Sequence, residues 1–242
     1  MRIPRIFTTQ NLTVNSCLDL EEAPSHHLSK VLRMQTGREL ILFNGLGGDY
    51  CATISAISKK TVSVQVSAYN PENRQSPLTL ELAIGISRGD RMDWVLQKAT
   101  ELGVTKITPL ITERTEVKLD GERAGKKTEH WQQTIISACE QSQRNLLPQL
   151  MQPVSLSEWI VKCDAELKFV LHHRDNQGLP DDTKTVANVA LLIGPEGGLS
   201  ENEINQALAQ QFSPLTLGPR VLRTETAPVA AISIVQYLWG DL

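Results

Sequence analysis

Two glycine-rich stretches follow short apolar runs near the end of this chain, Leu191-Leu192-Ile193-Gly194-Pro195-Glu196-Gly197-Gly198-Leu199-Ser200 and Leu215-Thr216-Leu217-Gly218-Pro219-Arg220-Val221-Leu222-Arg223-Thr224-Glu225-Thr226-Ala227. Each stretch predicts a strand, then a turn, then a helix. When two such strands share a sheet, their turns meet at the carboxyl ends of the strands, where open α/β sheets bind ligands. The two stretches therefore predict one crevice in an α/β fold.

The residues after each turn carry the signals of a helix start. Ser200 and Glu203 form a Ser-x-x-Glu capping box, and Leu199 with Ile204 fits the hydrophobic staple around it. Thr226 is the predicted N-cap of the last helix. Both turns are therefore expected to lead directly into helices.

A structural interpretation of these turns competes with a functional one. Gly-Pro and Gly-Gly are ordinary turn dipeptides, and one such turn alone indicates no more than a chain reversal. The second turn adds four polar side chains beside its glycine: Arg220, Arg223, Thr224 and Glu225. Polar groups next to backbone that can approach a ligand closely are what a small-molecule site requires. We therefore expect a binding site here.

The composition is that of a globular protein with one large or two small domains. Of the 242 residues, 40% are hydrophobic and 21% are charged, which is enough apolar material for a sizeable core. The net charge of -3 argues by itself against nucleic-acid binding, yet residues 1–70 hold seven Lys/Arg against five Asp/Glu. This asymmetry allows a mildly basic N-terminal module.

The cysteines and the apolar runs indicate the compartment. The four cysteines have neither metal-ligand nor redox spacing, so we expect reduced thiols in a cytoplasmic protein. The N-terminus begins no signal peptide, and no apolar run approaches the length of a membrane span. The histidine pairs 26–27 and 172–173 have unfavourable spacing for a metal, and we expect none. Phosphate-loop, dinucleotide and nucleophile-elbow fingerprints are also absent from the sequence.

The first part of the chain, residues 1–70, predicts a small β-barrel. Four β runs are expected there: 2–9, 39–44, 50–57 and 61–67. A short helix is expected after Ser25, ending at Gly37. Three apolar residues of this helix are expected to face inward: Leu28, Val31 and Leu32.

Residues 71–77 predict a polar linker, and strands alternate with helices from 78 to 242, which indicates a parallel sheet. The expected strands are 78–86, 107–111, 168–172 and 186–193. The expected helices are 91–102 and 128–142, with a charged loop at 112–127. The last helix, 228–239, is apolar nearly all round. It is therefore expected to be buried, packing against the second crevice and a partner subunit.

Four blocks of sequence, taken together, are specific to one family. In chain order they are His26-His27-Leu28 with Val31-Leu32-Arg33 and Gly37, then Lys98-Ala99-Thr100-Glu101-Leu102-Gly103-Val104 with Glu113-Arg114, then Gly194-Pro195-Glu196-Gly197-Gly198, then Leu217 to Ala227. In this order they resemble the RsmE family, the bacterial 16S ribosomal RNA uridine-N3 methyltransferases. The blocks cover both halves of the chain, and no departure occurs within them.

The resemblance implies a fold that local patterns do not predict. The family belongs to the SPOUT methyltransferases, whose C-terminal α/β domain, here 78–242, is tied in a deep trefoil knot, a rare feature in proteins. The family's N-terminal domain is a PUA-like RNA-binding barrel. Its members are homodimers that bind the methyl donor S-adenosylmethionine (SAM) in the knot, without a metal. The implied substrate is a specific uridine of 16S ribosomal RNA, in the assembled small ribosomal subunit.

On this resemblance, the two glycine turns hold SAM. We expect backbone groups to bind its adenine and ribose, since glycine allows the backbone to approach a ligand closely. A carboxylate, Glu196 or Glu225, would balance the sulfonium charge, and its burial requires a partner. The full expected cofactor set is His172, Ile193, Gly194, Glu196, Gly198, Leu217, Gly218, Leu222 and Thr224.

Uridine N3 carries a proton at neutral pH and must lose it before it attacks the methyl group. Arg223 is the expected stabiliser of the uridine anion, and Glu225 the expected proton acceptor, because arginine stays charged. The competing interpretation is a mutual salt bridge that only shapes the loop. Contacts to the RNA backbone are expected from the basic residues of the first part, although spacing alone favours a solvated helix face. They are Arg5, Lys30, Arg33 and Arg38.

Two other functions stay open on the sequence. The first is a non-catalytic RNA-binding protein with a degenerate knot, which the intact second glycine turn disfavours. The second is a SPOUT methyltransferase that acts on another RNA, for example on a ribose O2′, since the residues alone do not reveal the acceptor atom.

Overall fold

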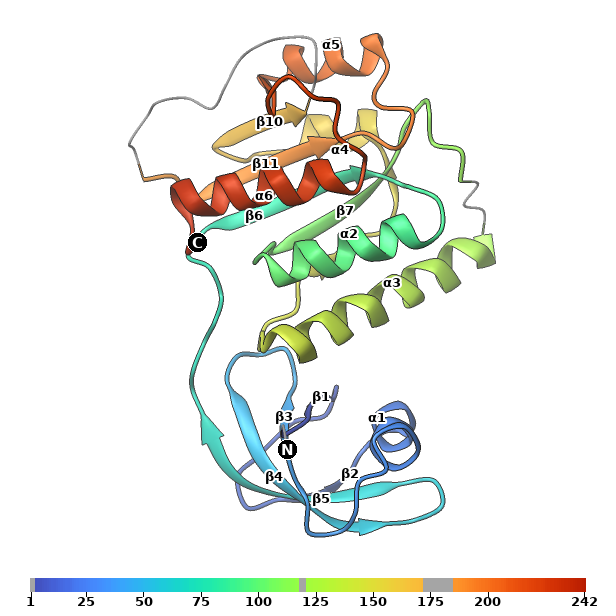
Figure 1. Ribbon diagram of the computed structural model, residues 1–242, viewed down its shortest axis with the longest axis vertical. Helices are drawn as coiled ribbons and strands as arrows, with labels where there is room; N and C mark the ends of the chain where they lie inside the picture. Colours follow the sequence, from blue (N-terminus) through green and yellow to red (C-terminus); the bar gives the residue numbers. More distant parts are fainter. Residues whose placement is uncertain (1–2, 118–120, 172–184) are drawn as a thin grey trace. The chain divides into compact units, whose positions relative to one another are not determined.

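The computed structural model describes residues 3–117, 121–171 and 185–242. The chain divides into two compact units, Met1–Gln75 with Cys139–Leu147, and Ser76–Ala138 with Pro148–Leu242 (Figure 1). A short segment from the middle of the sequence, 139–147, therefore completes the first unit. No helix among the described residues is both long enough and apolar enough to cross a membrane.

The first unit is built on a five-stranded sheet with the order β1-β3-β4-β5-β2. The strands are β1 (Arg5–Phe7), β2 (Cys17–Asp19), β3 (Glu39–Phe43), β4 (Asp49–Ile57) and β5 (Val62–Asn70). β1 pairs with β3 in parallel, and the remaining pairs are antiparallel. The alternation at Val62, Val64 and Val66 places all three side chains in the core, as the sequence predicts.

The helix of the first unit differs from its prediction. α1 (Glu22–His26) continues into a π-helical turn, η1 (His27–Val31), in which Leu32 N–H donates to His27 O at 2.9 Å. Leu28 is buried as expected, but Val31 and Leu32 are exposed, so their inward orientation was predicted wrongly. The reason is the wider π turn, which rotates these two side chains away from the Leu28 face.

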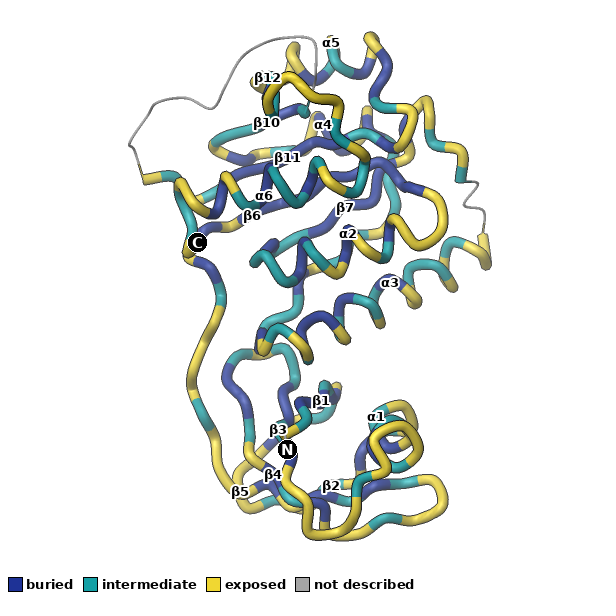
Figure 2. Tube along the Cα trace, in the orientation of Figure 1, coloured by how far each residue is buried: buried dark blue, intermediate teal, exposed yellow. Residues whose placement is uncertain are grey.

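The second unit contains a parallel sheet with the order β12-β10-β11-β6-β7-β8, and β9 also pairs with β7. The strands are β6 (Thr79–Gly85), β7 (Lys106–Ile111), β8 (Gln149–Leu150), β9 (Val154–Ser155), β10 (Leu167–Leu171), β11 (Asn188–Ile193) and β12 (Ser213–Leu215). The central strands β6 and β11 are almost continuously buried (Figure 2), as in sheets covered on both faces. The predicted α/β class is confirmed.

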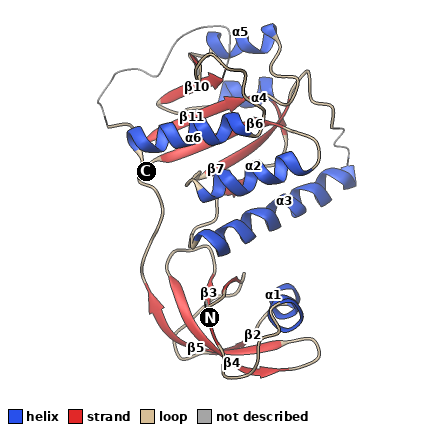
Figure 3. Ribbon diagram, viewed as in Figure 1, coloured by secondary structure: helices blue, strands red, loops and turns tan. Residues whose placement is uncertain are grey.

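The described residues that follow the first unit's strands also form the helices α2 (Asp90–Glu101), α3 (Gly121–Ser142), α4 (Leu156–Lys162), α5 (Glu201–Ala209) and α6 (Thr226–Trp239), and the last residues of α3 belong to the first unit. α2 packs against α6, and α4 against α5, on opposite faces of the sheet (Figure 3). The predicted charged loop at 112–127 is wrong in its second half, because α3 already begins at Gly121. The polar first turns of α3 have no apolar stripe to reveal them. The short α4 was not predicted either.

Two predictions for the last helix need correction. Thr226 is the first residue of α6 rather than its N-cap, and no side chain caps this helix start. The helix buries one side, where Gln236 accepts from the Ser76 hydroxyl and donates to Leu102 O, both at 2.8 Å. Its other side stays exposed in the single chain (Figure 2), through Ile234, Tyr237 and Leu238. The helix is therefore not buried all round, and its packing on a partner subunit stays a prediction.

Candidate active site

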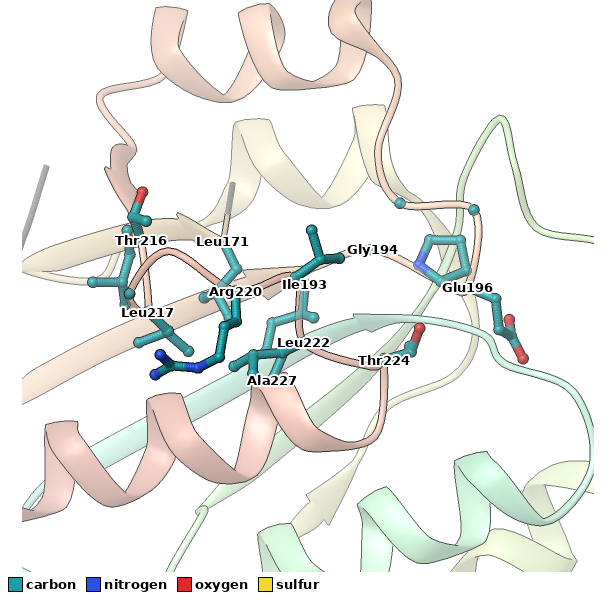
Figure 4. A pocket seen from close by; sticks show the side chains of 16 residues that line it. Leu171, Ile193, Gly194, Glu196, Thr216, Leu217, Arg220, Leu222, Thr224 and Ala227 are labelled. Atoms are coloured by element: carbon teal, nitrogen blue, oxygen red, sulfur yellow. The ribbon is translucent and has the colours of Figure 1, made fainter. Parts of the chain in front are cut away.

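A pocket lies where three neighbouring parallel strands of the second unit end. β11 ends at Ile193, β10 at Leu171 and β12 at Leu215, and the two glycine turns leave the sheet at this edge (Figure 4). The pocket has a volume of about 320 Å³. Its walls are Leu171, Ile193 to Gly198, Leu215 to Gly218, Arg220 to Leu222, Thr224 and Ala227.

Eight of the nine residues expected to hold a cofactor line this pocket. They are Ile193, Gly194, Glu196, Gly198, Leu217, Gly218, Leu222 and Thr224. The ninth, His172, lies outside the described residues. The crevice itself, formed by both glycine turns, is thus present as the sequence predicts, while the binding role of each residue stays a prediction.

Glycine is required in the first turn because the turn closes on itself. A Cβ on Gly194 would lie 2.7 Å from Leu199 N and 2.8 Å from the carbonyl carbon of Gly198, both of which are backbone atoms. In the second turn, Gly218 has a φ of +76°, a conformation that side chains disfavour. Both turns can therefore bring bare backbone against a ligand.

The first turn is also held from outside, by the segment that follows β7. Arg114 Nη1 donates to Gly197 O at 2.7 Å, and Glu113 N–H donates to Glu203 Oε1 at 2.8 Å. Asn202 donates to Glu113 at 3.2 Å, and the hydrogen bonds that Glu113 accepts lower the pKa of its carboxyl. These contacts join segments far apart in the chain, so no local sequence pattern predicts them.

Glu196 is the acidic residue in the pocket wall, and its carboxylate has the hydrogen-bonding partners that a partly buried charge requires. Its Oε1 accepts from Arg88 N–H at 2.9 Å and from Arg91 Nη1 at 3.1 Å. Partial burial raises its pKa, but these hydrogen bonds outweigh burial, so the net shift is downward and the carboxylate is ionised at neutral pH. Figure 4 shows its side chain at one end of the pocket, pointing away from Ile193 and Leu222.

Arg223 and Glu225 lie beside the pocket rather than in the wall formed by the described residues. Their charged groups are 4.0 Å apart, and Arg223 is 81% exposed. Because the Arg223 side chain is so exposed, this pair holds the loop weakly, and the guanidinium is available to another partner. Thr224 between them lines the pocket, which keeps both neighbours close to it. Arg220 also lies in the wall, although it is not in the expected cofactor set.

The basic residues predicted to contact RNA separate into two groups in the first unit. Lys30, Arg33 and Arg38 are exposed, and Arg33 has a φ of +49° after the π turn. Arg5 is buried instead: it pairs with Asp49 at 2.9 Å and hydrogen-bonds Asn145. A guanidinium enclosed in this way cannot reach a phosphate, so Arg5 is withdrawn from the predicted RNA contacts.

A metal is not indicated. Across residues 3–117, 121–171 and 185–242, no three His, Cys, Asp or Glu side chains gather as a metal centre would need.

Each of the two units matches a known protein family. Residues 74–236 match the family model of an RNA methyltransferase domain, and residues 20–67 match that of an RNA methyltransferase PUA domain. The ribosomal RNA small subunit methyltransferase E of Buchnera aphidicola subsp. Schizaphis graminum is 36% identical over 100% of this chain and 98% of its own length. That of Bacillus subtilis is 34% identical over 90% of this chain and 92% of its own.

Solved structures agree with these matches. A methyltransferase from Legionella pneumophila with bound SAM superposes with a TM-score of 0.97, at 44% identity and with 100% of both chains covered. The ribosomal RNA small subunit methyltransferase E of Neisseria gonorrhoeae, bound to S-adenosyl methionine, superposes with a TM-score of 0.92, at 38% identity, again over 100% of both chains.

Proposed function

This chain belongs to the ribosomal RNA small subunit methyltransferase E family, and we propose that it methylates N3 of a specific uridine in 16S ribosomal RNA. It is a SAM-dependent ribosomal RNA methyltransferase of the α/β class with a PUA-like N-terminal domain. The observation that carries the finer proposal is the pocket at the ends of β10, β11 and β12, because its walls contain both glycine turns.

The pocket suits the shape and chemistry of SAM. Its volume of about 320 Å³ falls within the range of small-molecule sites. Ile193, Leu217 and Leu222 offer apolar side chains to a flat adenine ring, and the close backbone of Gly194 offers amide and carbonyl groups. Glu196 carries the negative charge that a sulfonium favours.

SAM supplies the methyl group, and the residues beside the pocket prepare the acceptor. The S–CH₃ bond breaks as the N3–CH₃ bond forms, and the N3 proton leaves to a base. We assign Arg223 to the uridine anion, through hydrogen bonds to O2 or O4, and Glu225 to the proton. Glu225 lies between the guanidinium groups of Arg91 and Arg223, at 3.9 and 4.0 Å from them, beside the pocket where the uridine would enter. Holding the reactants in line contributes roughly 7–11 kcal/mol.

The target base must leave its stack to reach this pocket, so the enzyme must also hold the RNA backbone. We assign that task to the exposed Lys30, Arg33 and Arg38 of the first unit. The proposed substrate is the assembled small ribosomal subunit, in the cytoplasm. The four cysteines are free thiols, as a reducing compartment requires.

We also propose that the chain acts as a homodimer and that its second unit is knotted. Ile234, Tyr237 and Leu238 leave an apolar strip of α6 exposed in the single chain, which a second copy would cover. A sedimentation measurement is expected to give a dimer at micromolar concentration, and a monomer there would contradict the dimer.

The function is tested by methyl transfer from radiolabelled SAM. The acceptors are 16S RNA and small ribosomal subunits from a strain that lacks this protein, and the product is identified by nucleoside analysis. Label in 3-methyluridine, stronger with subunits than with free RNA, is expected. Label in a ribose or another base would discard the uridine-N3 assignment, and failure to bind SAM in calorimetry would favour a non-catalytic RNA-binding protein.

A matched pair of variants tests the catalytic assignment. Arg223→Ala is expected to bind SAM as the wild type does but to lose turnover by about 100-fold or more, as removal of a transition-state hydrogen-bond donor does. Arg123→Ala removes another exposed arginine, on α3, and is expected to leave turnover unchanged. Wild-type turnover in Arg223→Ala would reject the anion-stabilising role.

A further inference from the structure

One side chain, Arg91, contacts the acidic groups of both glycine-rich turns. It is the second residue of α2, and its Nη1 donates to Glu196 Oε1 at 3.1 Å. Its Nε lies 3.9 Å from Glu225 Oε2. We propose that Arg91 is a positioning residue for methyl transfer, which fixes the turn bearing Arg223 and Glu225 to the turn that lines the cofactor pocket.

The Glu196 end of this bridge is anchored independently. Glu196 also accepts the backbone N–H of Arg88 at 2.9 Å, so its carboxylate stays in place without Arg91. The Glu225 end of the bridge is held by fewer interactions. In the described part of the chain, the ion pairs of Glu225 are with Arg91 and with the exposed Arg223. Arg91 is therefore the link from the anchored turn to the less anchored one.

The start of α6 shows why such a link is needed. Glu225 occupies the N-cap position of α6, yet its side chain makes no capping hydrogen bond. The backbone there is held by the N–H groups of Thr226 and Ala227, which donate to Arg223 O at 2.9 and 3.0 Å. A capping side chain would accept a backbone N–H of the first helical turn. The Glu225 carboxylate instead pairs with Arg91, which supports this turn from outside the helix.

The magnitudes separate positioning from stability. Arg91 is 49% exposed, and ion pairs with so much solvent contact contribute little to folding. A displacement of about 1 Å in an active site, in contrast, can cost about 100-fold in rate. Loss of Arg91 should thus leave the protein folded and able to bind SAM, while the placement of Arg223 and Glu225 becomes inaccurate.

This inference rests on the proposed function, and its kinetic test uses four variants: Arg91→Ala, Arg91→Lys, Glu225→Gln, and the double variant Arg91→Ala/Glu225→Gln. Arg91→Ala is expected to lower kcat by about 10- to 100-fold with the SAM Kd within about threefold of wild type. Arg91→Lys should recover part of the loss, because it keeps the charge at one contact. The double variant should match the slower single variant, since Arg91 acts through Glu225.

The matched control is Lys126→Ala, which removes an exposed ion pair with Glu122 on α3. It is expected to leave kcat unchanged. Fully additive losses in the double variant would overturn the proposal, because Arg91 would then act without Glu225. A SAM Kd that rises as much as kcat falls would also overturn it, because Arg91 would then serve cofactor binding.

A second readout does not depend on activity. Hydrogen exchange at the amides of Thr226 and Ala227 should be faster in Arg91→Ala than in the wild type and in Lys126→Ala, because the turn has lost its support. Unchanged exchange would reject the positioning role. If the wild type methylates no ribosomal RNA, the proposed function fails, but the exchange measurement still decides whether Arg91 holds this turn.

Discussion

The backbone N–H of Glu113 donates a 2.8 Å hydrogen bond to Oε1 of Glu203, and this bond ties the segment after β7 to the helix that follows the first glycine turn. The other carboxylate oxygen of Glu203 accepts Ser200 N–H at 2.8 Å and completes the predicted capping box. One buried carboxylate thus closes the first turn of α5 and fastens it to a neighbouring segment.

Glu203→Ala should therefore destabilise the protein far more than an ordinary cap substitution. It leaves the buried N–H of Ser200 and the part-buried N–H of Glu113 without their acceptor, at a cost of about 2–4 kcal/mol. The thermal midpoint should fall by several degrees. The control is Asn205→Ala, at an exposed position of the same helix, which should change it little. Equal midpoints for the two variants would show that neither the capping box nor the bond to Glu113 contributes to stability.

A substitution at Gly194 should affect cofactor binding first. In Gly194→Ala the new Cβ would meet backbone atoms within 2.8 Å, so the first turn must open, and SAM affinity should fall by about tenfold or more. Calorimetry measures this directly.

Gly125→Ala is the control, because nothing lies within 4 Å of that position on α3. It should stabilise the protein by about 0.5–1 kcal/mol with no change in SAM affinity. Wild-type affinity in Gly194→Ala would show that the turn tolerates opening.

Much of the second unit was predictable because its signals are local. The Ser200–Glu203 capping box lies within one helical turn, and the apolar runs of β6 and β11 have the pattern of buried parallel strands. The glycines that line the pocket also lie in two short, continuous stretches of sequence. These features depend on neighbouring residues in the sequence, so the sequence alone predicts them.

The remaining features depend on tertiary contacts that no local pattern contains. The bridge from Arg91 to Glu196 and Glu225 joins three segments, and spacing along the chain does not reveal it. The burial of Arg5 follows from Asp49, which is far from it in sequence. Val31 was misplaced because a helical period of 3.6 residues does not hold in a π turn.

Charge reversal on the first unit tests the predicted RNA contacts. The double variant Lys30→Glu/Arg33→Glu should bind RNA more weakly, and its affinity should depend less on salt, with a log–log slope reduced by about 0.7–0.9 per lost phosphate contact. Lys59→Glu/Lys60→Glu makes the same change of net charge on the β4–β5 hairpin and should keep the wild-type slope. Equal slopes in both double variants would show a general charge effect rather than contacts at Lys30 and Arg33.

The pH dependence of stability should report Glu140, in the segment that completes the first unit. Burial raises the pKa of its carboxyl above the ordinary value of 4.5, against the hydrogen bond from Phe7 N–H and the positive charge of His27 and Arg5. Because the folded state holds this proton more tightly than the unfolded state, Glu140 costs stability once the pH rises above 4.5 and through the raised pKa.

In the wild type, Phe7 N–H donates to Glu140 Oε1 at 2.9 Å. In Glu140→Gln the amide oxygen can accept the same N–H, and the side chain carries no charge, so the desolvation cost of a buried carboxylate is removed. The variant should therefore melt at a higher temperature than the wild type at pH 7, because the cost of the buried carboxylate is gone. The difference should shrink as the pH falls toward 4.5, where the wild-type carboxyl is increasingly protonated in the folded state. Thermal melts of both proteins across this range measure the difference. A lower midpoint for the variant at pH 7 would mean that the attraction of the Glu140 carboxylate to Arg5 and His27 exceeds the cost of its burial.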